Sequence, residues 1–532
     1  MNPTLKKFTA LTLCFLLIFT LFLGCKAPRL DGQDDPAIYI NGQSADGLVT
    51  VGVRGGTGNL FEPNSPVELV VWCKSEKLNG QMAKITVDSS QADFYKTYEL
   101  TLKGNFKNAV SFTSEKNGIF TVNVELPSKE HYSFNLAVMP KNAMASYDFY
   151  YGIQPYLTRS YLWGEGFCLP GYDGEKSVEL ILDAAGYMGV NLVREDNVSW
   201  GGMQSGPYEK VDLSMQDFII NKINERGMKA NIIFGFNADK WSVADRFKST
   251  YDSNKGWTYM PNLDIWLDYT GKVADHYKNN NNILWEIWNE PNWEPFFTGT
   301  QEEYFSLLEA TAKALKKANP NAYVFSGGLA VAERSSNLPY YQKAAQLIAD
   351  GVLDSYGYHN HDGGDTYYDN MQLMASVTND ASLTVGGINS ESGVYGGNPA
   401  LLACKALYTR AAGGKGFVSF AFRKSVTPEN DINDYAYFNE YLQPTESVLT
   451  YSTVIRFLGS AKLEGSESSQ KDLQIDRYSA NGKKILVYYS LGTKSTTPTP
   501  EGKFTAYDMY GNQIELGDTI SVTTEPTYLI FD

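Results

Sequence analysis

Two glutamates, Glu290 and Glu391, each follow an apolar stretch of sequence and precede a turn. Glu290 lies in a Trp-Asn-Glu-Pro string after the run 283–287, and Glu391 lies before Ser-Gly after the stretch 383–390. A carboxyl group among tryptophans is partly desolvated, which raises its pKa toward the value that a general acid needs near neutral pH. With a second carboxylate about 5 Å away as nucleophile, such a pair performs two successive displacements at an acetal carbon, whereas a wider gap suits one displacement by water. The pair predicts acid–base and nucleophilic catalysis without a metal.

The elements that must position these glutamates lie between residues 154 and 458, where short β-branched or aromatic runs alternate with amphipathic helical stretches. Eight candidate strands begin near Leu162, Val190, Ala230, Ile283, Tyr323, Asp354, Leu383 and Phe417. Helix candidates between and after them include 211–226, 301–318, 340–350, 399–412 and 447–457. The strands recur about every 36 residues, and no Gly-rich phosphate turn opens a helix, which favours a closed (β/α)₈ TIM barrel over an open doubly wound sheet.

Active sites of such barrels lie at the C-terminal ends of the strands. Glu290 ends the predicted fourth strand and Glu391 the seventh, so the two carboxylates should face each other across the mouth of the barrel.

Strand-like sequence flanks the predicted barrel on both sides. Residues 37–150 alternate apolar and polar positions between Asn-Gly and Lys-Gly turns, and residues 459–532 return to the same pattern. We therefore predict an N-terminal and a C-terminal β-sandwich domain. We expect both to support the barrel structurally.

Charge and composition exclude several classes of protein. The 45 Lys and Arg residues face 60 Asp and Glu residues, a formal net charge of −15, which repels nucleic-acid phosphates. Cys73, Cys168 and Cys404 are few and far apart, which is not the pattern of a disulfide framework. The chain has only 4 His residues, too few and too dispersed for a His-rich metal centre around His359 and His361, so we expect no metal or other cofactor. The sequence does not predict an oligomeric state.

The N-terminus has the features of an export signal. Lys6 and Lys7 precede an apolar run over residues 8–23, which at about 1.5 Å per residue is too short for a typical membrane span. The run ends in Leu-Gly-Cys, which resembles a bacterial lipobox and implies a signal peptide over 1–24 and lipidation at Cys25. A tether over 25–36 would then attach the protein to the bacterial cell envelope, at the outer membrane or cell surface. The alternative is an ordinary signal with an accidental Cys and a secreted protein.

The string Trp288-Asn289-Glu290-Pro291 resembles the acid/base motif of the clan A glycoside hydrolases, TIM barrels whose catalytic glutamates end strands four and seven. The segment 189–194 is similar to their second strand and 355–359 to their sixth, and the trailing β-domain is similar to family 39 and its relatives. Two features depart from the pattern: residues 420–422 read Phe-Ala-Phe where many members carry a Trp, and no Thr-Glu-Phe/Trp string surrounds the second glutamate.

The resemblance implies a retaining glycosidase acting on an oligo- or polysaccharide, with Glu290 as acid/base and Glu391 as nucleophile. It further implies that Asn289 binds the 2-hydroxyl of the sugar and that Arg194 keeps the nucleophile ionised. Either Tyr358 or His359 would contact the sugar or the nucleophile.

Four tryptophans are candidate walls of sugar subsites, because apolar sugar faces stack on aromatic rings. They are Trp200, Trp241, Trp288 and Trp293. Core packing is the alternative for each ring. For the whole protein, the alternative function is a surface lipoprotein that binds carbohydrate on a barrel scaffold without cleaving it.

Overall fold

The computed structural model describes residues 38–162, 168–196, 200–361, 363–425 and 431–532. The predicted signal peptide, the tether and Cys25 lie outside the described residues. Within them, no helix is both long and apolar enough to cross a bilayer.

The N-terminal domain is a β-sandwich, as predicted. A four-stranded sheet in the order β1-β2-β4-β7 lies against a five-stranded sheet in the order β3-β9-β8-β5-β6. The strands are β1 (Ile38–Gln43), β2 (Val49–Arg54), β3 (Leu60–Phe61), β4 (Val67–Cys73), β5 (Met82–Ser89), β6 (Phe94–Thr101), β7 (Phe106–Phe112), β8 (Gly118–Glu125) and β9 (His131–Val138). Alternate residues of β5 are buried, because successive side chains of a strand point to opposite faces.

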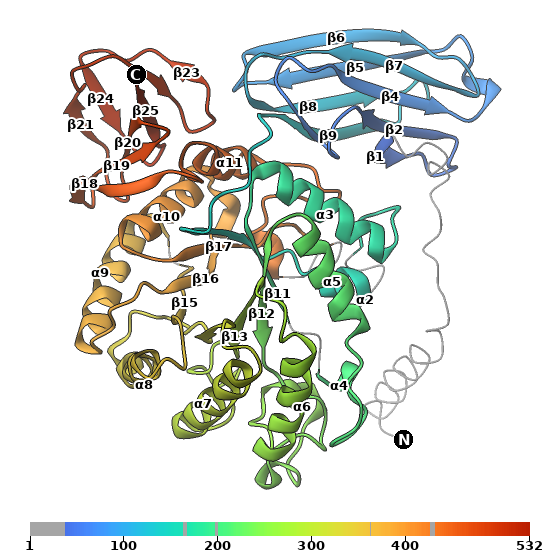
Figure 1. Ribbon diagram of the computed structural model, residues 1–532. Helices are drawn as coiled ribbons and strands as arrows, with labels where there is room; N and C mark the ends of the chain where they lie inside the picture. The colour runs from blue at the N-terminus through green and yellow to red at the C-terminus, as the bar shows by residue number, and fades with distance from the viewer. Residues whose placement is uncertain (1–37, 163–167, 197–199, 362, 426–430) are drawn as a thin grey trace, which may run out of the picture.

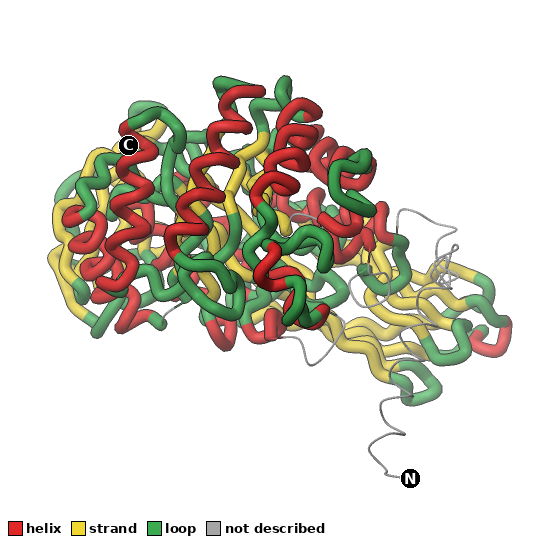
Figure 2. The backbone as a smooth tube through the Cα atoms, turned by 90° about the horizontal axis from the view of Figure 1, so that it is seen from below, coloured by secondary structure: helices red, strands yellow, loops and turns green. Residues whose placement is uncertain are grey.

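The central domain is a parallel β-barrel surrounded by helices, which confirms the predicted TIM barrel (Figures 1 and 2). Its strands are β10 (Tyr150–Ile153), β11 (Leu192–Asp196), β12 (Lys229–Phe234), β13 (Ile283–Ile287), β14 (Tyr323–Ser326), β15 (Gly357–His359), β16 (Ile388–Gly393) and β17 (Gly416–Phe420). The long helices are α3 (Gly174–Met188), α5 (Ser214–Glu225), α6 (Leu263–His276), α7 (Gln301–Ala318), α8 (Leu338–Ala349), α9 (Gly364–Asp380), α10 (Pro399–Ala411) and α11 (Glu446–Leu458). Isolated parallel bridges, Phe325 to Ser355 and Leu329 to Tyr358, close the barrel between β14 and β15.

The first barrel strand differs from the prediction. It is β10, which pairs with β11 and β17, whereas Leu162 belongs to the short helix α2 (Leu157–Leu162). The backbone amides of Leu157 and Thr158 donate to the buried carboxyl group of Glu195, at 2.8 and 3.0 Å. A partner on a distant strand thus satisfies the free amides of the first helical turn, and this tertiary contact overrides the β-like local sequence.

The interior of the barrel is layered. Its lower layer is a group of buried apolar side chains from six strands: Tyr150, Leu192, Leu284, Phe325, Ile388 and Val418. Residues two positions farther along three of these strands face the same way, which places Arg194, Glu286 and Ser390 above this layer. The polar layer lies toward the C-terminal ends of the strands, where a barrel carries its active site.

The C-terminal domain has a six-stranded sheet in the order β18-β19-β20-β25-β22-β23 and a two-stranded ribbon of β21 and β24, as predicted for a second β-domain. The strands are β18 (Lys462–Gln470), β19 (Leu473–Ala480), β20 (Lys483–Tyr489), β21 (Ser495–Pro498), β22 (Phe504–Tyr507), β23 (Gln513–Ile514), β24 (Thr519–Val522) and β25 (Thr527–Phe531).

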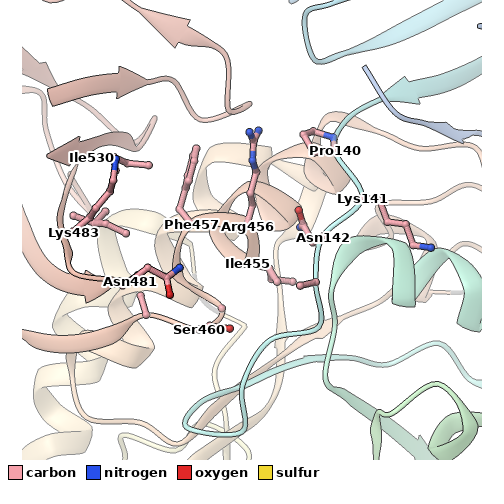
Figure 3. A pocket seen from close by; sticks show the side chains of 15 residues that line it. Pro140, Lys141, Asn142, Ile455, Arg456, Phe457, Ser460, Asn481, Lys483 and Ile530 are labelled. Atoms are coloured by element: carbon pink, nitrogen blue, oxygen red, sulfur yellow. The ribbon is translucent and has the colours of Figure 1, made fainter. Parts of the chain in front are cut away.

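The two flanking domains lie side by side on the barrel (Figure 1). They touch directly: the amide of Asn117 donates to Oδ1 of Asn512, and Nδ2 of Asn512 donates to the carbonyl of Asn117, at 2.8 and 3.0 Å. A cavity of about 490 Å³ lies where residues 140–143, the end of α11 and the C-terminal domain meet, with Arg456 and Phe457 of α11 between them (Figure 3).

Candidate active site

Glu290 lies on a backbone of unusual conformation at the end of β13. Trp288 and Glu290 have backbone φ angles of 73° and 46°. Residues other than Gly rarely adopt this left-handed conformation outside functional sites. The amide of Trp288 donates to the carbonyl of Phe234 on β12, and the amide of Glu290 donates to the carbonyl of Gly328 beyond β14. Contacts with β12 and with the loop after β14 hold this turn, and Glu290 with it, at the mouth of the barrel.

Glu391 lies within β16 rather than after it, at a β-bulge. Tyr358 pairs with Asn389 but His359 pairs with Glu391, so β16 contains one extra residue at this point. A bulge re-aims side chains, and here both Ser390 and Glu391 turn toward the barrel interior.

Arg194 is the centre of the polar layer and is completely buried. Its Nη1 donates to Glu391 Oε2 at 2.6 Å and to Gln154 Oε1 at 2.7 Å. Its Nε and Nη2 donate to the two carboxylate oxygens of Glu286 at 2.8 and 3.0 Å, and Nη2 also donates to Asn289 Oδ1 at 2.7 Å. The structure therefore brings Arg194, Asn289 and Glu391 together, as the resemblance implies.

Glu286 is a site residue that the sequence analysis missed. It is fully buried, and besides Arg194 its carboxylate accepts from Asn231 Nδ2 at 2.8 Å, Ser390 Oγ at 2.8 Å and the Gly328 amide at 3.1 Å. Burial alone raises the pKa of this carboxyl, but the Arg194 guanidinium and His359 lower the pKa to about 2. The available signal was an acidic residue at an inward position of a buried strand, four residues before Glu290.

His359 joins the two catalytic candidates. Its Nδ1 lies 2.8 Å from Glu290 Oε1, and its Nε2 lies 3.4 Å from Arg194 Nη2 and 3.9 Å from Glu286 Oε1. Burial opposes the charge on this ring, but the carboxylates of Glu391, Glu286 and Glu290 raise the pKa of His359 to about 9. At neutral pH the ring is therefore a cation that donates a hydrogen bond to Glu290.

Tyr358, the alternative to His359, points away from the site. Successive residues of β15 face opposite sides, and the buried Tyr358 ring lies beside Tyr356 outside the barrel interior. The ring of His359 lies against Gly328, where a Cβ atom would overlap Nε2. The close approach requires glycine at this position.

His361 is a second residue whose role the sequence analysis missed. The Gly393 amide donates to its Nδ1 at 3.1 Å, so Nδ1 carries the lone pair and Nε2 carries the proton. Nε2 lies 3.3 Å from Glu391 Oε1 and donates to it. Burial raises the pKa of Glu391, but His359, His361 and Arg194 together lower it well below the usual range. The candidate nucleophile is ionised.

The side chains of His359, His361 and Glu391 also bring potential metal ligands within 4.8 Å of one another. The Arg194 guanidinium, however, lies 2.6 Å from Glu391 and 3.4 Å from Nε2 of His359. A fixed positive charge at this position repels a metal cation, and Glu290 already engages Nδ1 of His359. These residues fit proton transfer better than metal binding.

A cavity of about 580 Å³ opens beside Glu391 and Asn289. Its lining is largely aromatic and polar, and consists of Gln154, Tyr156, Thr158, Arg159, Asp196, Ile233, Phe236, Asn237, Ala238, Tyr251, Ser253, Gly256, Trp257, Asn289, Phe296, Glu391 and Phe420. The long loop after β12, with its short helices η3 (Asp245–Phe247) and η4 (Ser253–Thr258), forms one wall. Volume and lining are typical of a ligand site.

For two of the four tryptophans, Trp200 and Trp288, the structure supports the alternative of core packing. Trp200 is fully buried against Trp241 and Trp266 at centroid distances of 5.2 and 5.4 Å, and Trp288 is fully buried with its Nε1 donating to the Phe296 carbonyl. Neither Trp200 nor Trp288 has a face left for a sugar, so both belong to the core. Trp293 is 51% exposed but is not part of the cavity lining.

Trp257 takes the place that was predicted for the other tryptophans. It is 40% exposed, lies in η4 and lines the cavity together with Phe296. Only the path of the loop after β12 brings this ring to the cavity.

Known proteins with similar sequences are glycoside hydrolases. The model of the family described as Cellulase (glycosyl hydrolase family 5) matches residues 165–377. A beta-xylosidase from Caldicellulosiruptor saccharolyticus is 34% identical over 123 residues, and one from Geobacillus stearothermophilus is 30% identical over 122 residues. Each match covers 22% of this chain and only about a quarter of the relative, 24% and 23%.

Among solved structures, the chain is similar to a family 39 glycoside hydrolase from the gut symbiont Bacteroides cellulosilyticus WH2. The TM-score is 0.67 with 14% sequence identity, over 90% of this chain and 100% of that one. At this identity the likeness concerns the fold, and it includes the flanking β-domains. The family model, the two relatives and the shared fold together confirm the resemblance of the barrel to the clan A glycoside hydrolases.

Proposed function

We propose that the protein is a glycoside hydrolase that cleaves O-glycosidic bonds of an oligo- or polysaccharide with retention of configuration. The observation that carries the proposal is the buried network in which Arg194 holds Glu391 and His359 holds Glu290, beside a cavity that reaches Glu391. Two carboxylates in different environments at one barrel mouth are the equipment for acid–base and nucleophilic steps.

In the first step Glu391, ionised through Arg194 and His361, attacks the anomeric carbon. Glu290 gives a proton to the leaving oxygen, and because His359 donates to Oε1 of Glu290, the transferable proton belongs on Oε2. In the second step Glu290 takes a proton from water, which displaces Glu391. Arg194 donates to Oδ1 of Asn289. The Nδ2 group of Asn289 is therefore the one that donates to the 2-hydroxyl of the sugar.

The curated relatives are named beta-xylosidases, so aryl β-D-xylosides are the first substrates to test. A nuclear magnetic resonance time course should show that the first product has the anomeric configuration of the substrate, because two displacements invert twice. Glu391→Ala should lower kcat by at least about 10⁴-fold, as expected for a removed nucleophile, and azide should restore part of the turnover with the opposite anomer.

Retention requires the carboxyl groups of Glu290 and Glu391 to lie about 5–5.5 Å apart. A first product of inverted configuration, or near-normal turnover by Glu391→Ala, would contradict the proposed roles. Sugar binding without turnover by the wild-type protein would favour the carbohydrate-binding alternative.

We also propose that the protein is exported and anchored in the bacterial cell envelope through a lipid on Cys25. The basic start, the short apolar run and the lipobox-like Leu-Gly-Cys string support this location.

A further inference from the structure

The cavity contains an ion pair that the proposed mechanism does not use. Asp196, at the end of β11, and Arg159, in α2, both line the cavity. Oδ2 of Asp196 accepts from Nε and Nη2 of Arg159 at 3.0 and 2.6 Å. The guanidinium of Arg159 also lies 4.0 Å from the ring centroid of Tyr156. Carboxylate and aromatic ring fix Arg159 from two sides.

The pair is only partly covered. The side chain of Arg159 is 26% exposed and that of Asp196 is 19% exposed. Burial opposes the charge of Arg159, but Asp196 raises the pKa of the guanidinium above its usual range. Nε and Nη2 of Arg159 both donate to Oδ2 of Asp196, and no described residue donates to Oδ1 of Asp196. This oxygen can therefore accept a hydrogen bond from a ligand.

The cavity has little positive charge for a negatively charged ligand. Arg159 is the one Lys, Arg or His among the described lining residues, and Asp196 occupies it. Arg194, deeper in the barrel, is occupied by Glu286 and Glu391. The internal segments outside the described residues contain no Lys, Arg or His by sequence.

We infer that the cavity selects an uncharged pyranose over a uronic acid, and that Asp196 determines this specificity. The inference rests on the proposed function. Hydroxyl groups of a neutral sugar donate to Oδ1 of Asp196. A sugar carboxylate instead meets the carboxylates of Asp196 and Glu391, while the nearby cations Arg159, Arg194 and His359 are already paired with carboxylates of the protein. Unpaired like charges in a partly buried site strongly disfavour binding.

The test compares aryl β-D-xyloside and β-D-glucoside with aryl β-D-glucuronide, and calorimetric binding of xylose with that of glucuronate. Wild-type kcat/KM should favour the better neutral substrate by at least about 100-fold. Asp196→Asn keeps the shape of the side chain but releases Arg159 from its ion pair. The ratio of kcat/KM on the neutral substrate to kcat/KM on the glucuronide should therefore fall by about tenfold or more. Glu309→Gln is the matched control, because it removes one negative charge from α7, where Glu309 pairs with Lys313 and Lys343.

Equal or faster cleavage of the glucuronide by the wild-type protein would overturn the inference, and so would an unchanged preference in Asp196→Asn. Glu309→Gln should keep the wild-type preference for neutral substrates over the glucuronide. If Glu309→Gln reduced this preference as much as Asp196→Asn does, the net charge of the protein and not Asp196 would determine it. If no glycoside is cleaved, the proposed function fails, but calorimetry still decides the inference. Binding of xylose without glucuronate supports it, whereas binding of glucuronate or of neither sugar overturns it.

Discussion

At the scale of single residues, the site depends on Arg194, a buried cation that two carboxylates share. Arg194 bonds both Glu286 and Glu391, and only Glu391 also borders the cavity. Glu286 thus acts as a permanent counter-ion that keeps Arg194 in place while Glu391 forms and loses a bond to the substrate. Removing one partner of a buried ion pair leaves an uncompensated charge, at a typical cost of about 3–5 kcal/mol.

The raised pKa of His359 predicts a pH dependence of stability. The pKa lies near 9 in the folded state and near 6.5 in the unfolded chain, so protonated His359 stabilises the fold fully below about pH 6.5. This contribution, roughly 3 kcal/mol in order of magnitude at ~1.4 kcal/mol per pH unit, is lost as the pH rises through about 9.

The measurement is the free energy of unfolding of wild type and His359→Gln between pH 6 and 10. Wild type should lose stability over this range by about 2–3 kcal/mol more than the variant. Parallel curves for the two proteins would mean that His359 is neutral in the folded state.

At the scale of elements, the site side chains are oriented by the ends of the barrel strands and by the bulge in β16. Gly328, in the loop after β14, accepts from the Glu290 amide, donates to Glu286 and leaves room for the His359 ring. A methyl group there would overlap Nε2 of His359 and lie 2.7 Å from Ser390 Oγ.

Gly328→Ala should therefore displace His359 and lower kcat on an aryl xyloside by about 10- to 100-fold, since small misplacements of catalytic groups have effects of this size. Gly271→Ala is the matched control: Gly271 lies in α6 with open space around the position of a Cβ atom. The control should keep wild-type kcat and gain up to about 1 kcal/mol in stability. Equal kcat in both variants would contradict the role assigned to Gly328.

The sequence predicted the elements with strong local patterns and missed those that tertiary contacts determine. The helix at 301–318 was predicted to the residue from its amphipathic sequence, and a capping box of Thr300 and Glu303 stabilises its start. The first strand was misplaced because Glu195 stabilises α2 from another strand. The contact of His361 with Glu391 depends on the bulge in β16, and alternating sequence patterns contain no signal for an inserted residue.

At the scale of the whole molecule, the flanking domains form a continuous support on one side of the barrel. Gln91 of the N-terminal domain and Tyr510 of the C-terminal domain both bond the carboxylate of Glu446, in the first turn of α11, at 2.7 Å. With the reciprocal Asn117–Asn512 contact, these bonds link all three domains through α11.

The proposed anchor predicts how the whole protein partitions. Expressed in bacteria, the full chain should sediment with membranes, and Cys25→Ser should release it or block processing, because stable anchoring requires the acyl chains of a lipoprotein. Cys168→Ser, at a partly buried position of the barrel, serves as the control and should still sediment. Wild-type protein found entirely in the soluble fraction would contradict the anchor.

The apolar layer of six side chains beneath Arg194 fills the barrel interior on the side away from the cavity. In the part of the chain that the structure describes, the cavity beside Glu391 is therefore the route that substrate, departing alcohol and incoming water share. Under the proposed mechanism, an alcohol that lingers in this cavity competes with water for the sugar bound to Glu391 and leaves as a new glycoside. The ratio of transfer to hydrolysis should therefore rise with the concentration of an added alcohol, and under the proposed mechanism the protein forms glycosides as well as cleaving them.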